Sequence, residues 1–129
     1  MRVHTRYDLI SENDETRREK YERMNRPVPE FEIPTDGIYL WDWFGQLCDA
    51  VHRIDFNGNY CVISPSEFLA WSTLTNNLIT PIEYDILKSM DLVFCNELNK
   101  EVQARHAKEE EKRKREMEAA KARSRTRRR

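Results

Sequence analysis

The sequence has little that would support a disulfide scaffold, a membrane span or a phosphate-binding loop. Its three cysteines, Cys48, Cys61 and Cys95, are widely spaced and odd in number, which is typical of a reducing compartment rather than of a disulfide or zinc-ribbon domain. No apolar run approaches the roughly 20 residues of a membrane helix, and the first residues contain no signal-peptide apolar segment. The three glycines are scattered and form no phosphate loop. We therefore expect a soluble, intracellular protein without a cofactor and without a membrane partner.

Basic side chains are almost missing from the middle of the chain. Residues 31–99 carry only Arg53 and Lys88 against ten carboxylates, a net charge of −8. Residues 100–129 carry thirteen basic and six acidic groups, a net charge of +7, and residues 1–30 carry seven of each. Such separation of charge bears on solubility and on the choice of partner. The pattern predicts three parts: a polar arm with a proline-rich linker over 1–33, a helical core domain over 34–99, and a charged, basic helical tail over 100–129.

Two short passages with one pattern mark the clearest helix starts. Ser64-Pro65-Ser66-Glu67 and Thr80-Pro81-Ile82-Glu83 both read hydroxyl residue, proline, any residue, glutamate. In such a capping box the hydroxyl accepts a hydrogen bond from the third helical amide and the glutamate accepts one from the amide of the capping residue. Proline suits the first helical position because it has no N–H to leave unpaired. Helices are therefore predicted over 65–75, ended by Asn76-Asn77, and from residue 81 into the tail.

Apolar residues at helical spacing predict an all-α fold, a small bundle of three main helices with the polar N-terminal arm and the long charged C-terminal helical tail. The first main helix is predicted over 36–54 with Thr35 as its N-cap. A weaker helix with little apolar content is predicted over 11–24, capped by Ser11 or Asn13. The expected core residues of the three main helices are Leu40, Trp43, Phe44, Leu47, Val51 and Ile54, then Phe68, Trp71 and Leu74, then Ile86, Leu87, Met90, Val93, Phe94 and Leu98.

Trp41 lies off the apolar stripe of the first predicted helix. Because each residue turns a helix by about 100°, Trp41 falls on a flank together with Cys48 and His52. A helix in a three-helix body normally buries one face, so the indole needs a second partner. The proline-rich stretch around Phe31 and another protein are both open at this point. Trp41, Cys48 and His52 are the candidate partner-binding residues.

The other chemical interpretations of the sequence fail on residue spacing. Asp55, Asn57 and Asn59 suggest a calcium-binding loop, but in either register the required glycine, the first ligand or the bidentate glutamate falls on an unsuitable residue. His52 has no second ligand at metal-binding spacing. A nucleophile pair of Cys48 and His52 would lack an orienting acid and an oxyanion hole. We expect no catalytic residue, no metal ligand and no enzymatic activity.

The basic tail could bind nucleic acid by releasing counterions. Glutamates are interleaved with its lysines and arginines, and no aromatic residue follows Phe94 that could stack on a base. An exposed, charged helix that keeps the protein soluble is favoured, and nucleic-acid binding is kept as an alternative.

Two consecutive motifs occupy the run ISPSEFLAWSTLTNNLITPIEYDILKSMD. The first, I-x-x-x-E-[FI]-x-A-W-x-x-L, corresponds to Ile63, Glu67, Phe68, Ala70, Trp71 and Leu74. The second, L-T-P-x-E-x-x-x-L-x-x-[ML]-D, corresponds to Ile79, Thr80, Pro81, Glu83, Leu87, Met90 and Asp91, with isoleucine where leucine is usual. Together with the aromatic-rich run that begins before Trp41, these motifs resemble the small tail assembly chaperones of long-tailed, siphovirus-like bacteriophages. The resemblance covers roughly residues 34–98.

The resemblance implies a non-enzymatic assembly factor in the host cytoplasm. Such proteins bind and solubilise the tape measure protein, help to recruit tail tube subunits during tail morphogenesis and are absent from the mature virion; self-association is compatible with this role. The physical properties agree independently, because a small acidic helical body with surplus aromatic surface suits the transient capture of amphipathic helices. The alternatives are a small nucleic-acid-associated phage protein that acts through its basic C-terminal tail, and a small structural head or tail subunit.

Overall fold

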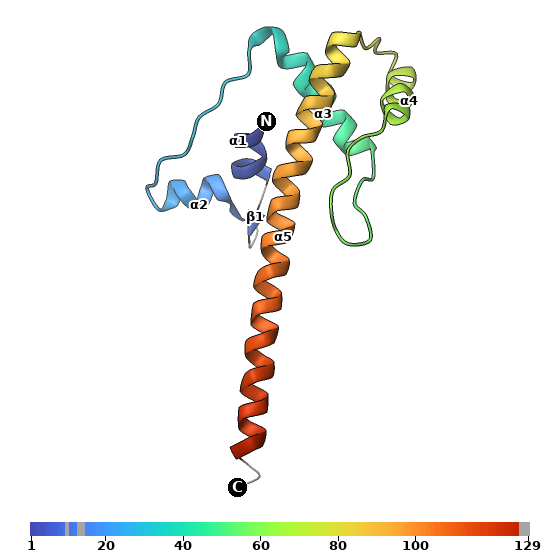
Figure 1. The fold of residues 1–129 in the computed structure, drawn as a ribbon. Helices are drawn as coiled ribbons and strands as arrows, with labels where there is room; N and C mark the ends of the chain where they lie inside the picture. The colour runs from blue at the N-terminus through green and yellow to red at the C-terminus, as the bar shows by residue number, and fades with distance from the viewer. Residues whose placement is uncertain (10, 13–14, 127–129) are drawn as a thin grey trace. The chain divides into compact units, whose positions relative to one another are not determined.

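The protein is all-α in the part of the chain that the computed structural model describes, residues 1–9, 11–12 and 15–126 (Figure 1). Side chains are described for residues 1–8 and 15–123. The elements are α1 (Arg2–His4), a π-helical turn (Thr5–Leu9), β1 (Ser11–Glu12), β2 (Glu15–Thr16), α2 (Arg17–Arg23), a 3-10 turn (Thr35–Gly37), α3 (Ile38–Ala50), α4 (Pro65–Thr75) and α5 (Pro81–Thr126). Of the helices in these ranges, none combines the length and the apolar character needed to cross a membrane.

The chain divides into two compact units, Met1–Asn99 and Lys100–Arg129, and α5 begins in the first and continues through the second. The division falls where the composition changes from acidic to basic. In the second unit, the side chains from 103 to 123 are exposed. The first unit contains residues 1–33 as well as α3, α4 and the start of α5.

The core of the first unit lies between α3, α4 and the first five turns of α5. Ring pairs join the three helices, with centroid distances of 5.7 Å for Trp43 and Trp71 and 5.6 Å for Phe44 and Phe94. Both pairs are edge-to-face, the arrangement that aromatic rings favour over face-to-face stacking. The buried residues are Leu40, Phe44 and Leu47 of α3, Ile63, Phe68 and Trp71 at and in α4, and Leu87, Phe94 and Cys95 of α5.

Both predicted capping boxes are present. Ser64 Oγ accepts from the Glu67 amide at 3.3 Å, and the Glu67 carboxylate accepts from the Ser64 amide at 2.6 Å. The corresponding distances for Thr80 and Glu83 are 3.4 and 2.7 Å. Helix α4 ends at Asn76, which has a left-handed conformation with φ of 56°. The predicted bounds of α4 and the start of α5 are confirmed, because a few consecutive residues encode each of them.

The prediction for the first main helix was wrong at both ends. Thr35 lies inside the 3-10 turn instead of capping the helix, and α3 begins at Ile38. At the other end the chain leaves the helix at Val51, which is extended with φ of −111° and ψ of 119°. His52 and Ile54 therefore do not lie on α3.

A buried ion pair explains why the helix stops. The guanidinium of Arg53 pairs with the carboxylate of Asp91 on α5 and lies over the ring of Phe94, 4.6 Å from its centroid. The second oxygen of Asp91 accepts from the Ile63 amide at 2.7 Å. A buried charge is tolerated only when it is paired and hydrogen-bonded, so the backbone after residue 50 follows the position that Asp91 requires.

The turn predicted at Asn57-Gly58 is present and is organised by Asp55. Gly58 has φ of 82°, a conformation that favours glycine. The Asp55 carboxylate accepts from the amides of Asn57 and Asn59, both at 2.8 Å, and the hydrogen bond from the Asn59 backbone is the first of the causes that lower its pKa. This carboxylate is thus used by the turn itself.

Three residues assigned to the core by periodicity are exposed. Leu74 is 86% exposed, and Ile54 and Ile86 are 44% and 41% exposed. Ile54 is exposed because α3 has already ended, and the other two lie at the edges of the stripes that α4 and α5 turn inward. The core assignment was wrong for these three residues.

The helix predicted over residues 11–24 is also shorter in the structure. Helix α2 covers Arg17–Arg23, and Thr16 caps it through a third capping box with Glu19, at 3.3 and 2.7 Å. Ser11, one of the two predicted caps, lies in β1, and Asn13, the other, lies outside the described residues. The arm contacts the core through Met1 and through an ion pair of 3.4 Å between Arg2 and Glu97.

Candidate functional site

The structure divides the three predicted partner-binding residues between two cavities. Trp41 and Cys48 line a cavity of about 360 Å³ under the N-terminal arm, together with Met1 and His4. His52 is exposed beyond the end of α3 and lines a different cavity of about 450 Å³. The three residues therefore do not form one patch, because the early end of α3 removes His52 from the helical face.

Trp41 is half-buried by the protein's own N-terminal arm. Its ring lies 4.9 Å from that of His4 and 5.8 Å from that of Phe31, measured between centroids. The stretch around Phe31 was one of the two partners that the sequence left open for this indole, and it does contact Trp41. A role for Trp41 in binding another protein stays a prediction.

Cys48 is placed for packing. Burial raises the pKa of its thiol to about 11, against the opposing influence of Arg53, whose Nη2 donates to Cys48 Sγ at 3.3 Å. Since the thiolate is the reactive form of cysteine, this side chain is mostly the unreactive thiol at neutral pH.

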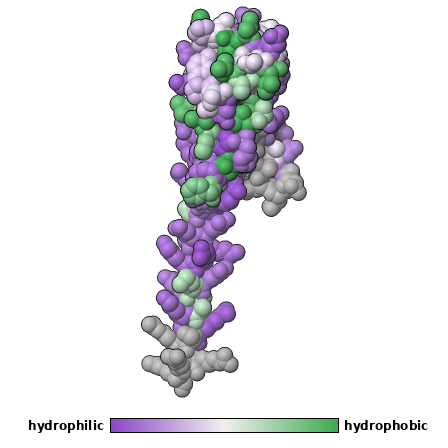
Figure 2. Space-filling model, turned by 90° about the vertical axis from the view of Figure 1, so that its right-hand side faces the viewer, coloured by the Kyte–Doolittle hydropathy of each residue, from purple (hydrophilic) through white to green (hydrophobic). Residues whose placement is uncertain are grey.

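Helix α4 carries apolar side chains on both flanks of its buried face. Phe68 and Trp71 point into the core, and Leu69 and Leu74 lie to either side of them because of the turn of about 100° per residue. Leu69 is 68% exposed, and Leu74 is the more exposed of the two. The side of the molecule on which α4 lies is turned to the viewer in Figure 2, where apolar surface gathers on the upper part and is interrupted by polar side chains.

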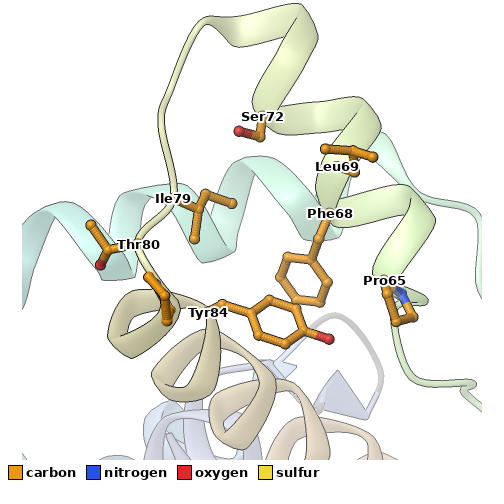
Figure 3. A pocket seen from close by; sticks show the side chains of 8 residues that line it. Pro65, Phe68, Leu69, Ser72, Ile79, Thr80 and Tyr84 are labelled. Carbon is orange, nitrogen blue, oxygen red and sulfur yellow. The ribbon is translucent and has the colours of Figure 1, made fainter.

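The first flank forms a groove of about 380 Å³ between α4 and the start of α5, which we call the α4–α5 groove (Figure 3). Its floor is the edge-to-face pair of Phe68 and Tyr84, with a centroid distance of 5.2 Å. The other lining residues are Pro65, Leu69, Ser72, Ile79, Thr80 and Pro81. Both proline-containing helix starts thus meet at this groove, which gives the repeated capping pattern a common location.

The second flank forms the larger cavity, which we call the α3–α4 groove. Its lining residues are Ala50, Val51, His52, Glu67, Ala70, Trp71, Leu74 and Thr75. Helix α3 ends at Ala50, in this groove, and its last turn contains no lysine or arginine. Glu67, whose carboxylate accepts from the Ser64 amide, is the acidic member of the lining.

Further apolar side chains are exposed where α4 passes into α5. Leu78 in the connection is 87% exposed and Ile82 in the first turn of α5 is 73% exposed. Leu69, Leu78 and Ile82 were not among the predicted site residues, because they lie off the periodic stripes. The signal that could have found them is the surplus of large apolar residues beside each stripe, which a core of this size does not use.

The chemistry available in the two grooves is that of binding. They present aliphatic and aromatic walls with a few polar groups at the edges, which is how proteins accommodate apolar side chains of a ligand or partner. Within the described residues, no three histidine, cysteine, aspartate or glutamate side chains are grouped so as to hold a metal ion. Comparison of the chain with models of protein families, with curated proteins and with solved structures finds no match.

Proposed function

We propose that this protein is a phage tail assembly chaperone that binds and solubilises the tape measure protein and helps to recruit tail tube subunits during tail morphogenesis. The observation that carries the proposal is the exposure of large apolar side chains on both flanks of α4, beside grooves of about 380 and 450 Å³. Monomeric proteins rarely expose contiguous apolar patches larger than about a few hundred Å² unless the patch binds a partner or ligand. Grooves of this kind accept the apolar face of an amphipathic helix.

The family resemblance supports the same role. The two motifs that carry it run from Ile63 to Leu74 and from Ile79 to Asp91. These segments build α4 and the start of α5, and hence the walls of the α4–α5 groove and one wall of the α3–α4 groove.

The charge and size of the binding surface fit a transient helper rather than a permanent subunit. Residues 31–99 have a net charge of −8, which speeds the encounter with basic partners and repels acidic ones. Each groove has room for only a few side chains, and small interfaces are typical of weak, reversible complexes. A chaperone must release its client when the tail tube assembles, so modest affinity is suitable.

Co-expression tests the proposal. Under this proposal, the tape measure protein of the same phage is expected to be insoluble alone and soluble when the two are produced together, and a tag on either protein should recover the other. The finished virion should lack this chain. A tape measure protein that stays insoluble in its presence would contradict the proposal, and finding the chain in purified virions would favour a structural subunit. Retention on DNA that is lost with added salt would favour the nucleic-acid alternative.

A further inference from the structure

Two residues that periodicity assigned to the core, Leu74 and Val51, instead line the α3–α4 groove. Leu74 belongs to the periodic stripe of α4, yet it is exposed, and Val51 belongs to that of the first predicted helix, yet it lies half-buried on the extended segment beyond α3. Both line the same groove, whose inner wall is the buried ring of Trp71. Apolar side chains in a helical stripe are normally covered. The pattern at this groove therefore corresponds to a covering element that the described residues of the first unit do not supply.

The end of α3 gives this groove a negative character. A helix leaves its last four carbonyl groups without helical partners and carries a partial negative charge at that end. The last turn of α3 contains no basic side chain. Glu67 lines the facing wall, and His52 is the other titratable side chain of the lining. A cation beside the apolar wall would meet both the carbonyl end and the carboxylate.

We propose that the α3–α4 groove binds an amphipathic helix whose apolar stripe is flanked by lysine or arginine. An aliphatic side chain of this helix packs against Leu74 and Trp71, and a neighbouring cation lies at the carbonyl end of α3 near Ala50. The inference rests on the proposed function in so far as that function supplies a helical client.

The α4–α5 groove does not fit such a partner equally well. The first residues of two helices, Pro65 and Pro81, line it, so it lies at two helix N-termini, each of which is capped by a glutamate. Its lining contains no carboxylate, and Lys88 follows Tyr84 by one turn of α5. This groove serves as the matched control, because α4 contributes one exposed leucine to each side.

The first experiment compares Leu74→Ser with Leu69→Ser. The probe is a labelled synthetic helical peptide with a leucine stripe flanked by lysines, and a second peptide carries glutamate in place of lysine. The wild-type chain is expected to bind the lysine peptide, with at least about tenfold weaker binding of the glutamate peptide. Leu74→Ser should weaken the binding of the lysine peptide about tenfold, since a buried leucine contact is lost. Leu69→Ser, in the groove whose charge suits this peptide less, should weaken it less than Leu74→Ser does. Fluorescence anisotropy measures the binding, and a thermal melt checks that both variants fold.

The second experiment changes the charge at the end of α3. Ala50→Lys places a cation where the cation of the partner would lie and should weaken binding of the lysine peptide, whereas Ala50→Gln, of similar length and without charge, should weaken it less. The difference between the two variants should shrink with added salt.

Each result bears on the groove separately from the proposed function. Absence of binding by the wild-type chain, equal binding of the two peptides, or an effect of Leu69→Ser at least as large as that of Leu74→Ser would overturn the inference. If the peptide results hold and the tape measure protein still stays insoluble, the groove stands and the proposed function fails. If Leu74→Ser solubilises the tape measure protein as well as the wild-type chain does, the function stands and the groove is not its binding site.

Discussion

Helix α4 and the start of α5 differ from α3 in what determines where they begin and end. Each of the former starts at a capping box of four consecutive residues, and α4 ends at Asn76 in a left-handed conformation. Helix α3 begins after a 3-10 turn at Gly37, which has no side chain to accept a capping hydrogen bond, and it ends where Arg53 turns toward Asp91. The starts of α4 and α5 and the end of α4 depend on neighbouring residues. The end of α3 depends on Asp91, which lies 38 positions from Arg53 in the sequence.

Two kinds of interaction therefore stabilise the first unit, Met1–Asn99. The starts of α4 and α5 are stabilised by hydrogen bonds between residues that are three positions apart in the sequence. The segment from Val51 to Ile63, by contrast, is held by side chains of α5: Asp91 binds Arg53 and the Ile63 amide, and Asn99 binds the backbone of Tyr60. Substitutions in the two regions should therefore lower the free energy of unfolding by different amounts.

Loss of the buried carboxylate should have the largest effect. Asp91→Ala leaves the guanidinium of Arg53 buried without its counter-charge and the Ile63 amide without its acceptor, so the free energy of unfolding is expected to fall by about 3–5 kcal/mol. Urea denaturation followed by tryptophan fluorescence measures the loss. Asp85→Ala, at an exposed carboxylate on the same helix, is the control and should stay within about 0.5 kcal/mol of the wild type. Equal effects of the two changes would show that the Arg53–Asp91 pair does not hold the segment.

The second contact of α5 with the segment should matter less, because it is neutral. The Asn99 side chain accepts from the Tyr60 amide at 2.7 Å and donates to the Tyr60 carbonyl at 2.9 Å. Asn99→Ala leaves both backbone groups without this partner and should cost about 1–3 kcal/mol. The same measurement on Asn96→Ala, one turn earlier and exposed, should give almost no change. A similar loss for both asparagines would remove the distinction.

The same contrast explains how much of the fold could be predicted. The all-α class, the two capping boxes, the bounds of α4 and the turn at Gly58 depend on neighbouring residues, and the sequence contains all of that information. The end of α3 could not be predicted in this way, because the residues after Ala50 are held outside the helix by residues further along the chain. Arg53 pairs with Asp91, and the Arg53 carbonyl accepts a hydrogen bond from the Cys61 amide. One signal was available: Arg53 is one of two basic residues among ten carboxylates in 31–99.

The candidate site was predicted less well than the fold. Helical geometry placed Trp41, Cys48 and His52 on one flank, and this grouping required α3 to continue to Ile54. The grooves beside α4 arise from how three elements meet, and periodicity assigned Leu74, one of their main residues, to the core. An apolar stripe at helical spacing predicts that its side chains will be buried, but it does not show whether the residues that bury them belong to the same chain.

Substitution in a capping box should lower the free energy of unfolding less than the loss of a contact between residues distant in the sequence. Thr80→Ala removes the hydroxyl that accepts from the Glu83 amide and should lower the free energy of unfolding by about 1 kcal/mol. Thr80→Ser keeps the acceptor and should recover most of the loss. Denaturation in urea distinguishes the two variants, and a loss in Thr80→Ala as large as in Asp91→Ala would mean that the start of α5 is not held locally.

The smallest expected change concerns the end of α3, which lacks a basic residue. Ala50→Lys places a cation in the last turn of the helix, where it interacts favourably with the carbonyl end, and should raise the free energy of unfolding by about 0.3–1 kcal/mol relative to Ala50→Gln. The gain should be near the lower limit because residue 50 is exposed, and it should decrease as salt is added. Thermal melts of the two variants at low and high ionic strength measure it. The sign is informative, because the same lysine is expected to weaken the binding of a basic helix in the α3–α4 groove. A variant that becomes more stable while losing its partner would show that the carbonyl end of α3 is kept without a cation for binding, whereas a lysine that changes neither stability nor binding would show that this helix end is already satisfied within the chain.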